Sequence, residues 1–512
     1  MRRIALLAVS IVFCCAVFAG EQGKPKIFKA AMTTNPASLD EGISNSNFTR
    51  QISIYVYETL FTFGEDYRLI PQLADSFTKS GTDFVITVRK DAVFHNGKKM
   101  TAADVKASVE RFMKTGLAGT RFTNLKEIEI IDEHTLKFVM TKDMILPEEL
   151  ALPSRVVIMP AEIAERLGKN EVKAQDMIGT GPYKLVEWKS DIHVKLAKFD
   201  EYVPDERYDG ADGFGGKRVA HFDEVYFIPA PEAESRISGL ETGAFDFAEA
   251  IPATSYSRLA DNKKISLEVV KPRWAVVVEL NHVAPFMKDA KFRRALVHAL
   301  DMDKVMKAVT TGRKEFYRLQ PSIFTPEQFF YTEKGSTGIY NNYDLDKAKA
   351  LLKEAGYNGE ELVYLYNKDF DWMYKAALAM ADQWKKAGIN VVLEMHDWPS
   401  QIKKAQTLKE WAINQSGWSP RFDPSQTNGY FSSSSIGSYG YNNPKMDQLL
   451  VDLTEGRPSD ERKALWEELQ ELVWDDVTVI RVGDYFELEG INAKYKGYKS
   501  YTVFPRFWNV HE

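Results

Sequence analysis

Two patterns of hydrophobic residues alternate along almost the whole chain of 512 residues. Segments in which every second residue is apolar predict strands, and segments in which apolar residues recur every three or four positions predict helices. Phe84, Ile86 and Val88 follow the strand pattern, whereas Val105 and Val109 begin a helical face. This alternation favours mixed α/β layers over an all-helical or all-β fold.

Several predicted elements carry signals at their ends. Asn96-Gly97 is typical of a tight turn. Thr101 with Asp104 resembles a capping box, with Asp in place of the usual Glu. Asp344 can cap a later helix, and Gly356 supplies its stop. These signals predict helices that begin near residues 102 and 345.

A helix followed by a strand is predicted between residues 374 and 395. Gly388 ends the helix, and apolar residues then alternate from Val391 to Met395, which is typical of a crossover in an open sheet. The region 200–216 is rich in Asp, Gly and Tyr and is interpreted as a long surface loop. The predicted helical stripe consists of Tyr374, Leu378, Ala381 and Trp384.

The N-terminal 19 residues have the organisation of an export signal. Arg2 and Arg3 precede an apolar run from residue 4 to residue 18, and Val17-Phe18-Ala19 offers a small-residue cleavage site. The run is too short to span a bilayer. We therefore expect a signal peptide at residues 1–19 and a mature chain that is water-soluble and works outside the cytoplasm.

Both cysteines, Cys14 and Cys15, lie within that predicted signal. A mature chain without cysteine excludes disulfides, zinc thiolate sites and cysteine nucleophiles. A lipoprotein signal would place a small residue before the modified cysteine, but Phe13 precedes Cys14. Free export to the periplasm of a two-membrane bacterium is therefore favoured over a lipid anchor.

Length and charge restrict the function further. A chain of 512 residues exceeds the size at which one hydrophobic core usually divides, so at least two lobes are expected. Without Arg2 and Arg3, the 66 basic residues become 64, against 72 acidic ones. Nothing in this balance predicts a basic surface for nucleic acid.

A search for catalytic motifs finds none with the required context. The eight histidines include no pair at the i, i+4 spacing of a metal site, and the phosphate loop and the Gly-x-Ser-x-Gly motif are absent. We therefore expect no enzyme activity, no cofactor and no metal. A secreted hydrolase remains the alternative from another functional class.

One series of motifs resembles the extracytoplasmic solute-binding proteins of family 5, the peptide, nickel and oligosaccharide receptors of ABC importers. Its signature region is PQLADSFTKSGTDFVITVRKDAVFHNGKKMTAADVKASVERFMK at 71–114. It continues with GTGPYKLVEW at 179–188, FDEVYF at 222–227, LETGAFDF at 240–247, LNHVAPFMKDAKFRRALVHALD at 280–301, YDLDKAKALLKEAGY at 343–357, GWSPRFDP at 417–424 and GYNNPKMDQLL at 440–450.

The resemblance implies an α/β fold with a two-lobe periplasmic-binding-protein clamp of type II. Its large family-5 form carries an extra subdomain in the first lobe. Residues 20–272 and 484–512 would form lobe I with this subdomain, and residues 273–483 would form lobe II. Ligand would be enclosed between the lobes when the hinge closes.

The resemblance also places the segment after Trp418 in the cleft. Peptide-binding relatives usually carry an acidic residue three positions after this tryptophan, but here the position is Arg421. A guanidinium matches a carboxylate or phosphate rather than an amino terminus. For Arg421 a solvated loop charge or a salt bridge between the lobes stays open. For Asp423 a ligand role and a turn role stay open.

Three further residues are candidates for the cleft. Trp274 lies near the expected crossing into lobe II, and Trp398 is expected to begin a loop after a strand. For both, core packing is the alternative. Asn45, in the polar run 44–47, offers a donor and an acceptor, with a solvated loop as the alternative.

These observations predict a periplasmic receptor that captures a peptide or similar small organic solute. Its expected partners are that solute and the permease and ATPase complex of an ABC importer in the inner membrane, and the receptor is expected to be a monomer. Arg421 keeps open an anionic, opine-like, glycoside or metal-chelate ligand.

Overall fold

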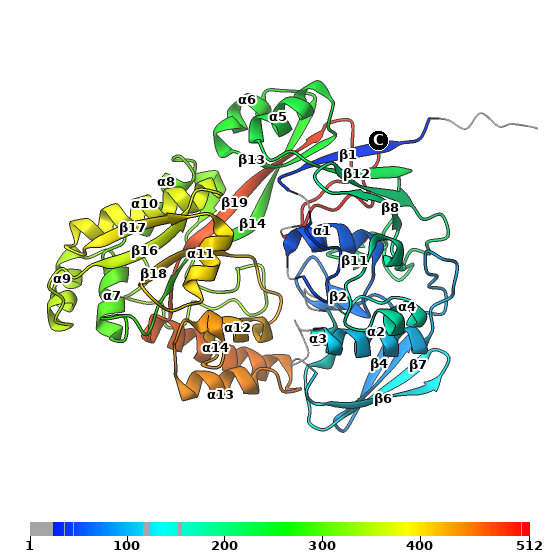
Figure 1. Cartoon of the computed structure of the whole chain (residues 1–512), viewed down its shortest axis with the longest axis horizontal. Helices are drawn as coiled ribbons and strands as arrows, with labels where there is room; N and C mark the ends of the chain where they lie inside the picture. Colours follow the sequence, from blue (N-terminus) through cyan, green and yellow to red (C-terminus); the bar gives the residue numbers. More distant parts are fainter. Residues whose placement is uncertain (1–23, 35, 45, 116–121, 152–155, 503) are drawn as a thin grey trace, which may run out of the picture.

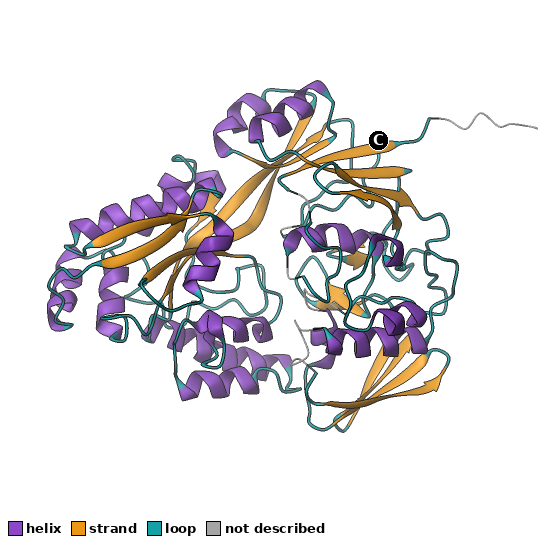
Figure 2. Ribbon diagram, in the orientation of Figure 1, coloured by secondary structure: helices purple, strands orange, loops and turns teal. Residues whose placement is uncertain are grey.

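The computed structural model describes residues 24–34, 36–44, 46–115, 122–151, 156–502 and 504–512. The predicted signal at residues 1–19 lies outside them. Two lobes stand side by side and are joined along one edge by long strands (Figures 1 and 2). Below, the first lobe means the described parts of residues 24–264 and 493–512, and the second lobe means residues 281–478.

One large sheet runs through both lobes. Its order is β17-β16-β18-β14-β19-β13-β1-β12-β9-β8, and the short β15 (Tyr317–Arg318) pairs with β19. The strands are β1 (Ile27–Met32), β8 (Tyr183–Lys189), β9 (His193–Lys198), β12 (Glu224–Pro229), β13 (Phe247–Ile251), β14 (Ile265–Leu280), β16 (Leu362–Asn367), β17 (Val391–His396), β18 (Ile413–Trp418) and β19 (Val479–Asn492).

The antiparallel pair β14 and β19 forms the middle of this sheet. Ile265 pairs with Asn492 at one end and Glu279 with Val479 at the other, so both strands pass from one lobe into the other. On the first-lobe side β13 continues the ladder from β19, and on the second-lobe side β18 continues it from β14. The connection between the lobes is therefore built from continuous backbone hydrogen bonds.

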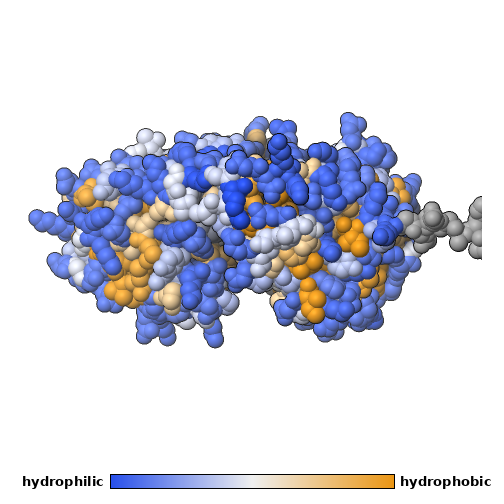
Figure 3. Space-filling model, turned by 90° about the horizontal axis from the view of Figure 1, so that it is seen from above, coloured by the Kyte–Doolittle hydropathy of each residue, from blue (hydrophilic) through white to orange (hydrophobic). Residues whose placement is uncertain are grey.

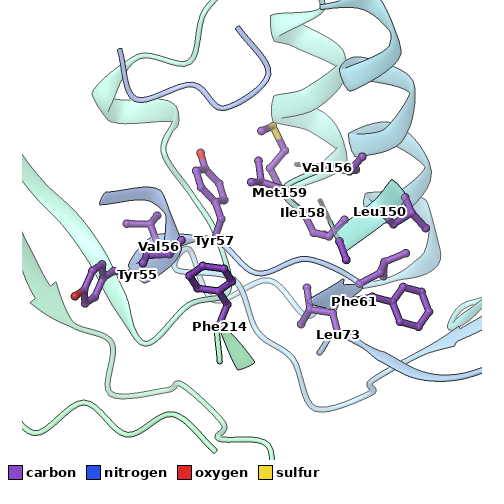
Figure 4. Close-up of a cluster of buried hydrophobic side chains, with 14 of the residues drawn as sticks. Tyr55, Val56, Tyr57, Phe61, Leu73, Leu150, Val156, Ile158, Met159 and Phe214 are labelled. Atoms are coloured by element: carbon purple, nitrogen blue, oxygen red, sulfur yellow. The ribbon is translucent and has the colours of Figure 1, made fainter. Parts of the chain in front are cut away.

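The first lobe adds a separate antiparallel sheet of order β4-β5-β7-β6 and a hairpin of β2 and β3. Its buried core includes aromatic and aliphatic side chains from widely separated segments, among them Tyr55, Phe61, Ile158 and Phe214 (Figure 4). The elements are β2 (Phe61–Phe63), β3 (Leu69–Pro71), β4 (Ala74–Ser80), β5 (Asp83–Val88), β6 (Leu125–Asp132), β7 (Thr135–Met140), β10 (Ala211–Asp212), β11 (Gly215–Gly216), α1 (Asn47–Val56), α2 (Ala102–Lys114), α3 (Leu146–Ala151), α4 (Ala161–Leu167), α5 (Ala233–Thr242) and α6 (Tyr256–Ala260).

In the second lobe, helices pack on the sheet formed by β16, β17 and β18. Strands β16 and β17 are parallel and joined by α10, as the predicted crossover requires. The helices are α7 (Ala290–His298), α8 (Met302–Val309), α9 (Leu345–Glu354), α10 (Asp371–Lys386), α11 (Trp398–Ala405), α12 (Asn428–Phe431), α13 (Pro444–Asp452) and α14 (Ser459–Asp475).

The predicted helix caps are present. The Thr101 hydroxyl and the Asp104 carboxylate form a capping box at the start of α2, and Asp344 accepts a hydrogen bond from the backbone N–H of Lys347 at the start of α9. Gly356 follows α9 with a φ of 72°, the left-handed conformation expected of a helix stop.

Two local predictions were wrong. Ala381 and Trp384 of the predicted helical stripe are buried, but Leu378 is an exposed residue of α10, and the buried face continues through Met373, Ala377 and Met380. The region 200–216 is not a solvated loop throughout, because β10 and β11 form a small hairpin in it and the Phe214 side chain between them is buried in the first-lobe core. Packing against distant segments decided both cases.

No helix among the described residues is long and apolar enough to cross a membrane. Seen from above, the elongated molecule carries a largely hydrophilic surface with separate apolar patches (Figure 3).

Candidate ligand-binding site

A small cavity lies beside the crossing strands β14 and β19, on the second-lobe side. Its volume is about 10 Å³, roughly the space that one water molecule needs. Three predicted site residues, Trp274, Trp418 and Arg421, line it together, although 144 positions separate the two tryptophans. The other lining residues are Pro272, Ala275, Ile323, Thr325, Ser419, Pro420, Arg481 and Asp484.

The strand register places Trp418 at this cavity. Trp418 is the last residue of β18 and pairs with Ala275 of β14. Its ring is buried and its indole N–H donates to the Glu279 carboxylate at 3.0 Å. Because the indole nitrogen is satisfied on the core side, the ring has a fixed orientation as a wall of the cavity.

Trp274 belongs to an aromatic stack at the same strands. Its ring is stacked on Trp372 at 6.5 Å, and Trp372 is stacked on Tyr485 at 5.6 Å. Gly417 permits this arrangement, since a Cβ atom there would lie 2.2 Å from the Trp372 ring. Trp274 is half-buried, so one part of its ring supports the core while another part lines the cavity.

Arg421 lies in the segment that leaves β18. Its guanidinium sits 4.8 Å from the centroid of the Tyr430 ring and donates to the Tyr430 hydroxyl. Tyr430 in turn packs on Trp418 with ring centroids 4.3 Å apart. Tyr430 therefore holds the guanidinium close to the tryptophan wall through a cation–π contact and a hydrogen bond.

Sequence reasoning missed Arg481 and Asp484, which line the same cavity from β19. Both side chains are buried, and Arg481 donates to Asp484. The signal that could have drawn attention to Arg481 is its position inside the apolar run of residues 479–482, where a strand has little reason to carry a charge.

A β-bulge brings these two residues to one face. Val276 pairs with Gly483 and Val277 pairs with Arg481, so Val482 is the extra residue of β19. In a regular strand, side chains three positions apart point to opposite faces. The inserted residue restores a common face, and Arg481 and Asp484 therefore meet at the cavity.

Arg318 connects this cavity with a larger one. It donates to Asp484 at 2.8 Å and to Glu327 at 2.6 Å. Glu327 lines the second cavity, whose volume of about 500 Å³ is in the range of small-molecule sites. This cavity is lined by residues of the first lobe, of β14 and of the second lobe: Glu65, Tyr67, Glu268, Val269, Val270, Lys271, Glu327, Lys499, Ser500, Tyr501 and Thr502.

The remaining predicted site residues lie elsewhere. Asp423 is buried and binds Arg462 through both carboxylate oxygens at 2.7 Å, while capping the 3₁₀ turn Pro424–Thr427. Trp398 begins helix α11 rather than a loop, packs edge-on against Phe370 and lines neither cavity. Asn45 lies outside the described residues.

Next to Arg421, the Phe422 side chain reaches into the first lobe. Its ring centroid lies 4.9 Å from that of Phe63 and 5.7 Å from those of Tyr67 and Phe214. Only 5% of Phe422 is exposed. The segment that carries the cavity arginine is therefore also a contact between the two lobes.

A second contact joins the lobes at their ends remote from the large sheet. We call it the distal contact; it consists of residues 79 and 143–148 of the first lobe with residues 454–462 of the second. The Ile145 N–H donates to the Thr454 carbonyl at 3.2 Å, and Lys79 Nζ donates to the Gly456 carbonyl at 3.0 Å. The lobes thus touch at the joining strands and again at their far ends.

A cluster of buried charges lies where β14 enters from the first lobe. Arg273 faces Glu487 at 3.0 Å and Glu249 and Glu489 at 3.7 Å. Burial, opposed by Arg273, raises the pKa of Glu489 to about 8, and burial also raises the pKa of Glu487. Because one guanidinium cannot balance three buried carboxylates, a proton on Glu489 is favoured. We call these four residues the hinge cluster.

The described residues include no group of three or more His, Cys, Asp or Glu side chains arranged to hold a metal ion. The charged groups at the small cavity are two guanidinium groups and a single carboxylate, and this balance suits an oxyanion better than a cation.

Comparisons with known proteins agree with this geometry. Residues 68–439 match the profile of the bacterial extracellular solute-binding proteins, family 5 Middle. A probable peptide ABC transporter periplasmic-binding protein of Sinorhizobium fredii is 25% identical over 501 residues, which cover 93% of this chain and 91% of that protein. The glutathione-binding protein of Pectobacterium atrosepticum is 25% identical over 459 residues, covering 86% and 85% of the two chains.

Solved structures show the same fold. The ABC transporter-associated periplasmic binding protein DppA of Helicobacter pylori in complex with the peptide STSA has a TM-score of 0.78 and 24% identity, covering 95% of this chain and 98% of that one. A binding protein of A. tumefaciens R10 in complex with agropinic acid has a TM-score of 0.77 and 23% identity, covering 93% and 96%. The profile match spans well over half of the sequence, and this chain belongs to the bacterial extracellular solute-binding proteins of family 5.

Proposed function

We propose that this chain is the periplasmic receptor of an ABC importer, which captures a peptide or similar small organic solute between its lobes and delivers it to the membrane permease. Proteins of family 5 are transport receptors rather than enzymes. The observation that carries the proposal is the convergence of Trp274, Trp418 and Arg421 on one cavity at the strands that join the lobes.

The geometry supports capture by closure. Strands β14 and β19 form a continuous connection, while Phe422 and the distal contact can separate without breaking any sheet. A ligand that contacts both lobes has more affinity for the closed form and therefore shifts the equilibrium toward it. Our proposed lobe limits, 20–272 with 484–512 and 273–483, put both divisions inside these two strands.

The proposal includes export by the predicted signal at residues 1–19, a monomeric receptor without catalytic activity, and a permease and ATPase complex in the inner membrane as partner. Support comes from the named relatives, which are described as ABC transporter periplasmic-binding and glutathione-binding proteins. The capture of glutathione, peptides or agropinic acid by such relatives makes small organic solutes the class to test.

A thermal-shift screen with purified protein tests the proposal. A ligand at 100 times its dissociation constant adds about 2.7 kcal/mol to the free energy of unfolding, which is a readily measured rise in melting temperature. We expect dipeptides or related solutes to produce this rise. If glycosides or sugars raise the melting temperature and no peptide does, the peptide part of the proposal is wrong.

A further inference from the structure

Arg481 is a buried cation with unused hydrogen-bonding capacity. It is 2% exposed, and within the described part of the chain its Nε and Nη1 atoms have no hydrogen-bond partner. Only Nη2 is engaged, with Asp484. A guanidinium has five N–H donors, and leaving several of them buried without an acceptor carries a large desolvation cost.

Arg421 adds a second such group on the same cavity. Its Nη2 atom donates to Tyr430, but its buried Nε atom lacks a partner among the described residues. Asp484 does not neutralise the pair, because it also accepts hydrogen bonds from Arg318 at 2.8 Å and from Gln320 at 2.9 Å. Asp484 and Glu327 pair with Arg318 and Arg481, and Arg421 lines the same cavity without an ion pair among the described residues, which leaves one positive charge in this group.

The position of Arg481 is built into the fold. The bulge at Val482 turns its side chain toward Asp484 and the cavity, and bulges of this kind often re-aim a side chain beside a functional site. Trp418 and Trp274 supply apolar walls next to the guanidinium groups. The combination of flat walls and forked donors suits a planar acid group better than a bulkier tetrahedral one.

We infer that Arg421 and Arg481 form a carboxylate-binding site, and that the solute of this receptor carries a carboxylate which docks on both guanidinium groups. This inference rests on the proposed function, because the acid group is part of the solute that the lobes enclose. The site would select acidic solutes, while the adjoining 500 Å³ cavity would hold the rest of the molecule.

Matched probes test the inference. We would titrate the full mature chain with a dipeptide library prepared once as free acids and once as C-terminal amides, and measure the dissociation constants. Loss of a charged hydrogen-bonded pair costs enough to weaken binding about 10- to 100-fold. We therefore expect the acids to bind at least tenfold more tightly than the amides. Arg421→Gln and Arg481→Lys should remove most of that difference.

Control variants separate this effect from misfolding. Arg294→Gln changes a partly exposed arginine of the same lobe that pairs with Asp475 and lines neither cavity, and it should leave the preference for acids unchanged. Arg481→Lys keeps a positive charge opposite Asp484 but lacks the fork of donors. If the Arg481 variant does not fold, as judged by its melting temperature without ligand, the Arg421 variant still decides the outcome.

Three results would overturn the inference. Equal affinity for acids and amides would reject the carboxylate site and leave the receptor function intact. Protection by inorganic phosphate that exceeds that by every acid, and that disappears in Arg421→Gln, would assign the site to phosphate instead. Failure of both libraries and of the wider solute screen would reject the receptor function and the inference together.

Discussion

The hinge and the distal contact both join the two lobes, but they are built from different interactions. At the hinge, β14 and β19 share a long antiparallel ladder, and Arg273 lies among three buried carboxylates. At the distal contact, the described residues of the two lobes share a backbone hydrogen bond between Ile145 and Thr454. Partly exposed side chains of the first lobe add to it: Lys79 contacts Gly456, and Glu148 contacts Arg462. One connection is continuous backbone, and the other consists of contacts that can separate.

This difference assigns different roles to the two regions. Breaking the hinge ladder would expose buried backbone groups and charges, so the hinge contributes mainly to the stability of the fold. The distal contact and Phe422 share no strand between the lobes and can separate when the lobes open, so they set the balance between open and closed forms. Variants in the hinge should change the free energy of unfolding. Variants at Phe422 or in the distal contact should change the equilibrium between the open and closed forms.

The largest effect is expected from Arg273→Met in the hinge cluster. Removing the guanidinium leaves Glu249, Glu487 and Glu489 buried without their cation, and breaking a buried pair in this way costs about 3–5 kcal/mol. Urea denaturation measures the change in the free energy of unfolding. Arg258→Met, at a half-exposed arginine of the first lobe, is the control and should change it little. A loss below about 1 kcal/mol for Arg273→Met would contradict the stabilising role of the cluster.

The second effect is a pH dependence that arises at Glu489. Its pKa is raised from 4.5 to about 8, so the folded state holds this proton more tightly than the unfolded state does. Stability from this group is therefore fully present below pH 4.5 and is lost as the pH rises toward 8, by on the order of 1 kcal/mol per unit. Arg273 and the hydrogen bond from Tyr498 lower the pKa of Glu489, whereas the nearby carboxylates Glu487 and Glu249 raise it.

Glu489→Gln isolates that dependence. Burial lowers the pKa values of His95 and His282 to about 4, and these two residues make stability rise with pH between about 4 and 6.5. The difference between the wild type and the variant cancels their contribution. Melting curves from pH 5 to pH 8 should show a smaller loss of stability in the variant; identical slopes would rule out a titration at Glu489.

Phe422→Ala should act on closure rather than on folding. The variant removes four aromatic contacts, with Phe63, Tyr67, Phe214 and Tyr501, each worth about 0.5–1.5 kcal/mol. We expect a larger radius of gyration in small-angle scattering without ligand, and at least tenfold weaker solute binding. Phe329→Ala, at an exposed phenylalanine of the second lobe, is the matched control. An unchanged radius of gyration and affinity would show that Phe422 does not hold the lobes together.

The smallest effect is expected from Lys79→Ala at the distal contact. Lys79 pairs with Asp143 and donates to the Gly456 carbonyl, but about a third of its side chain is exposed. Exposed ion pairs contribute at most about 1 kcal/mol and are screened by salt. A modest loss of solute affinity at low ionic strength, absent at high ionic strength, is the expected outcome. A loss as large as that of Phe422→Ala would remove the distinction between the two contacts.

Local patterns predicted much of the fold because they depend on residues only a few positions apart. The strand at Phe84, the capping box of Thr101 and Asp104, and the cap at Asp344 are all present. The family motifs predicted the two-lobe α/β clamp, and the profile match and related structures confirm that fold. The predictions failed where packing against distant segments decides which residues are buried. Leu378 is exposed although it was predicted to be buried, and Phe214 is buried although it was predicted to lie in a surface loop.

The candidate site required the tertiary structure. The sequence singled out Trp274, Trp418 and Arg421, but it could not show that they meet. It also left Asp423 undecided; two positions from Arg421, this residue is bound to Arg462, which is 39 residues away along the chain.

What the sequence determined by itself is the order of elements, their caps, and membership of the family, since these follow from short-range periodicity and from motifs in a fixed order. What only the tertiary structure decided is the chemistry of the cavity. Arg481 reaches it because β14 and β19, some 200 residues apart, pair with one extra residue at Val482. A register between distant strands is set by the packing of both faces, so no local pattern contains it.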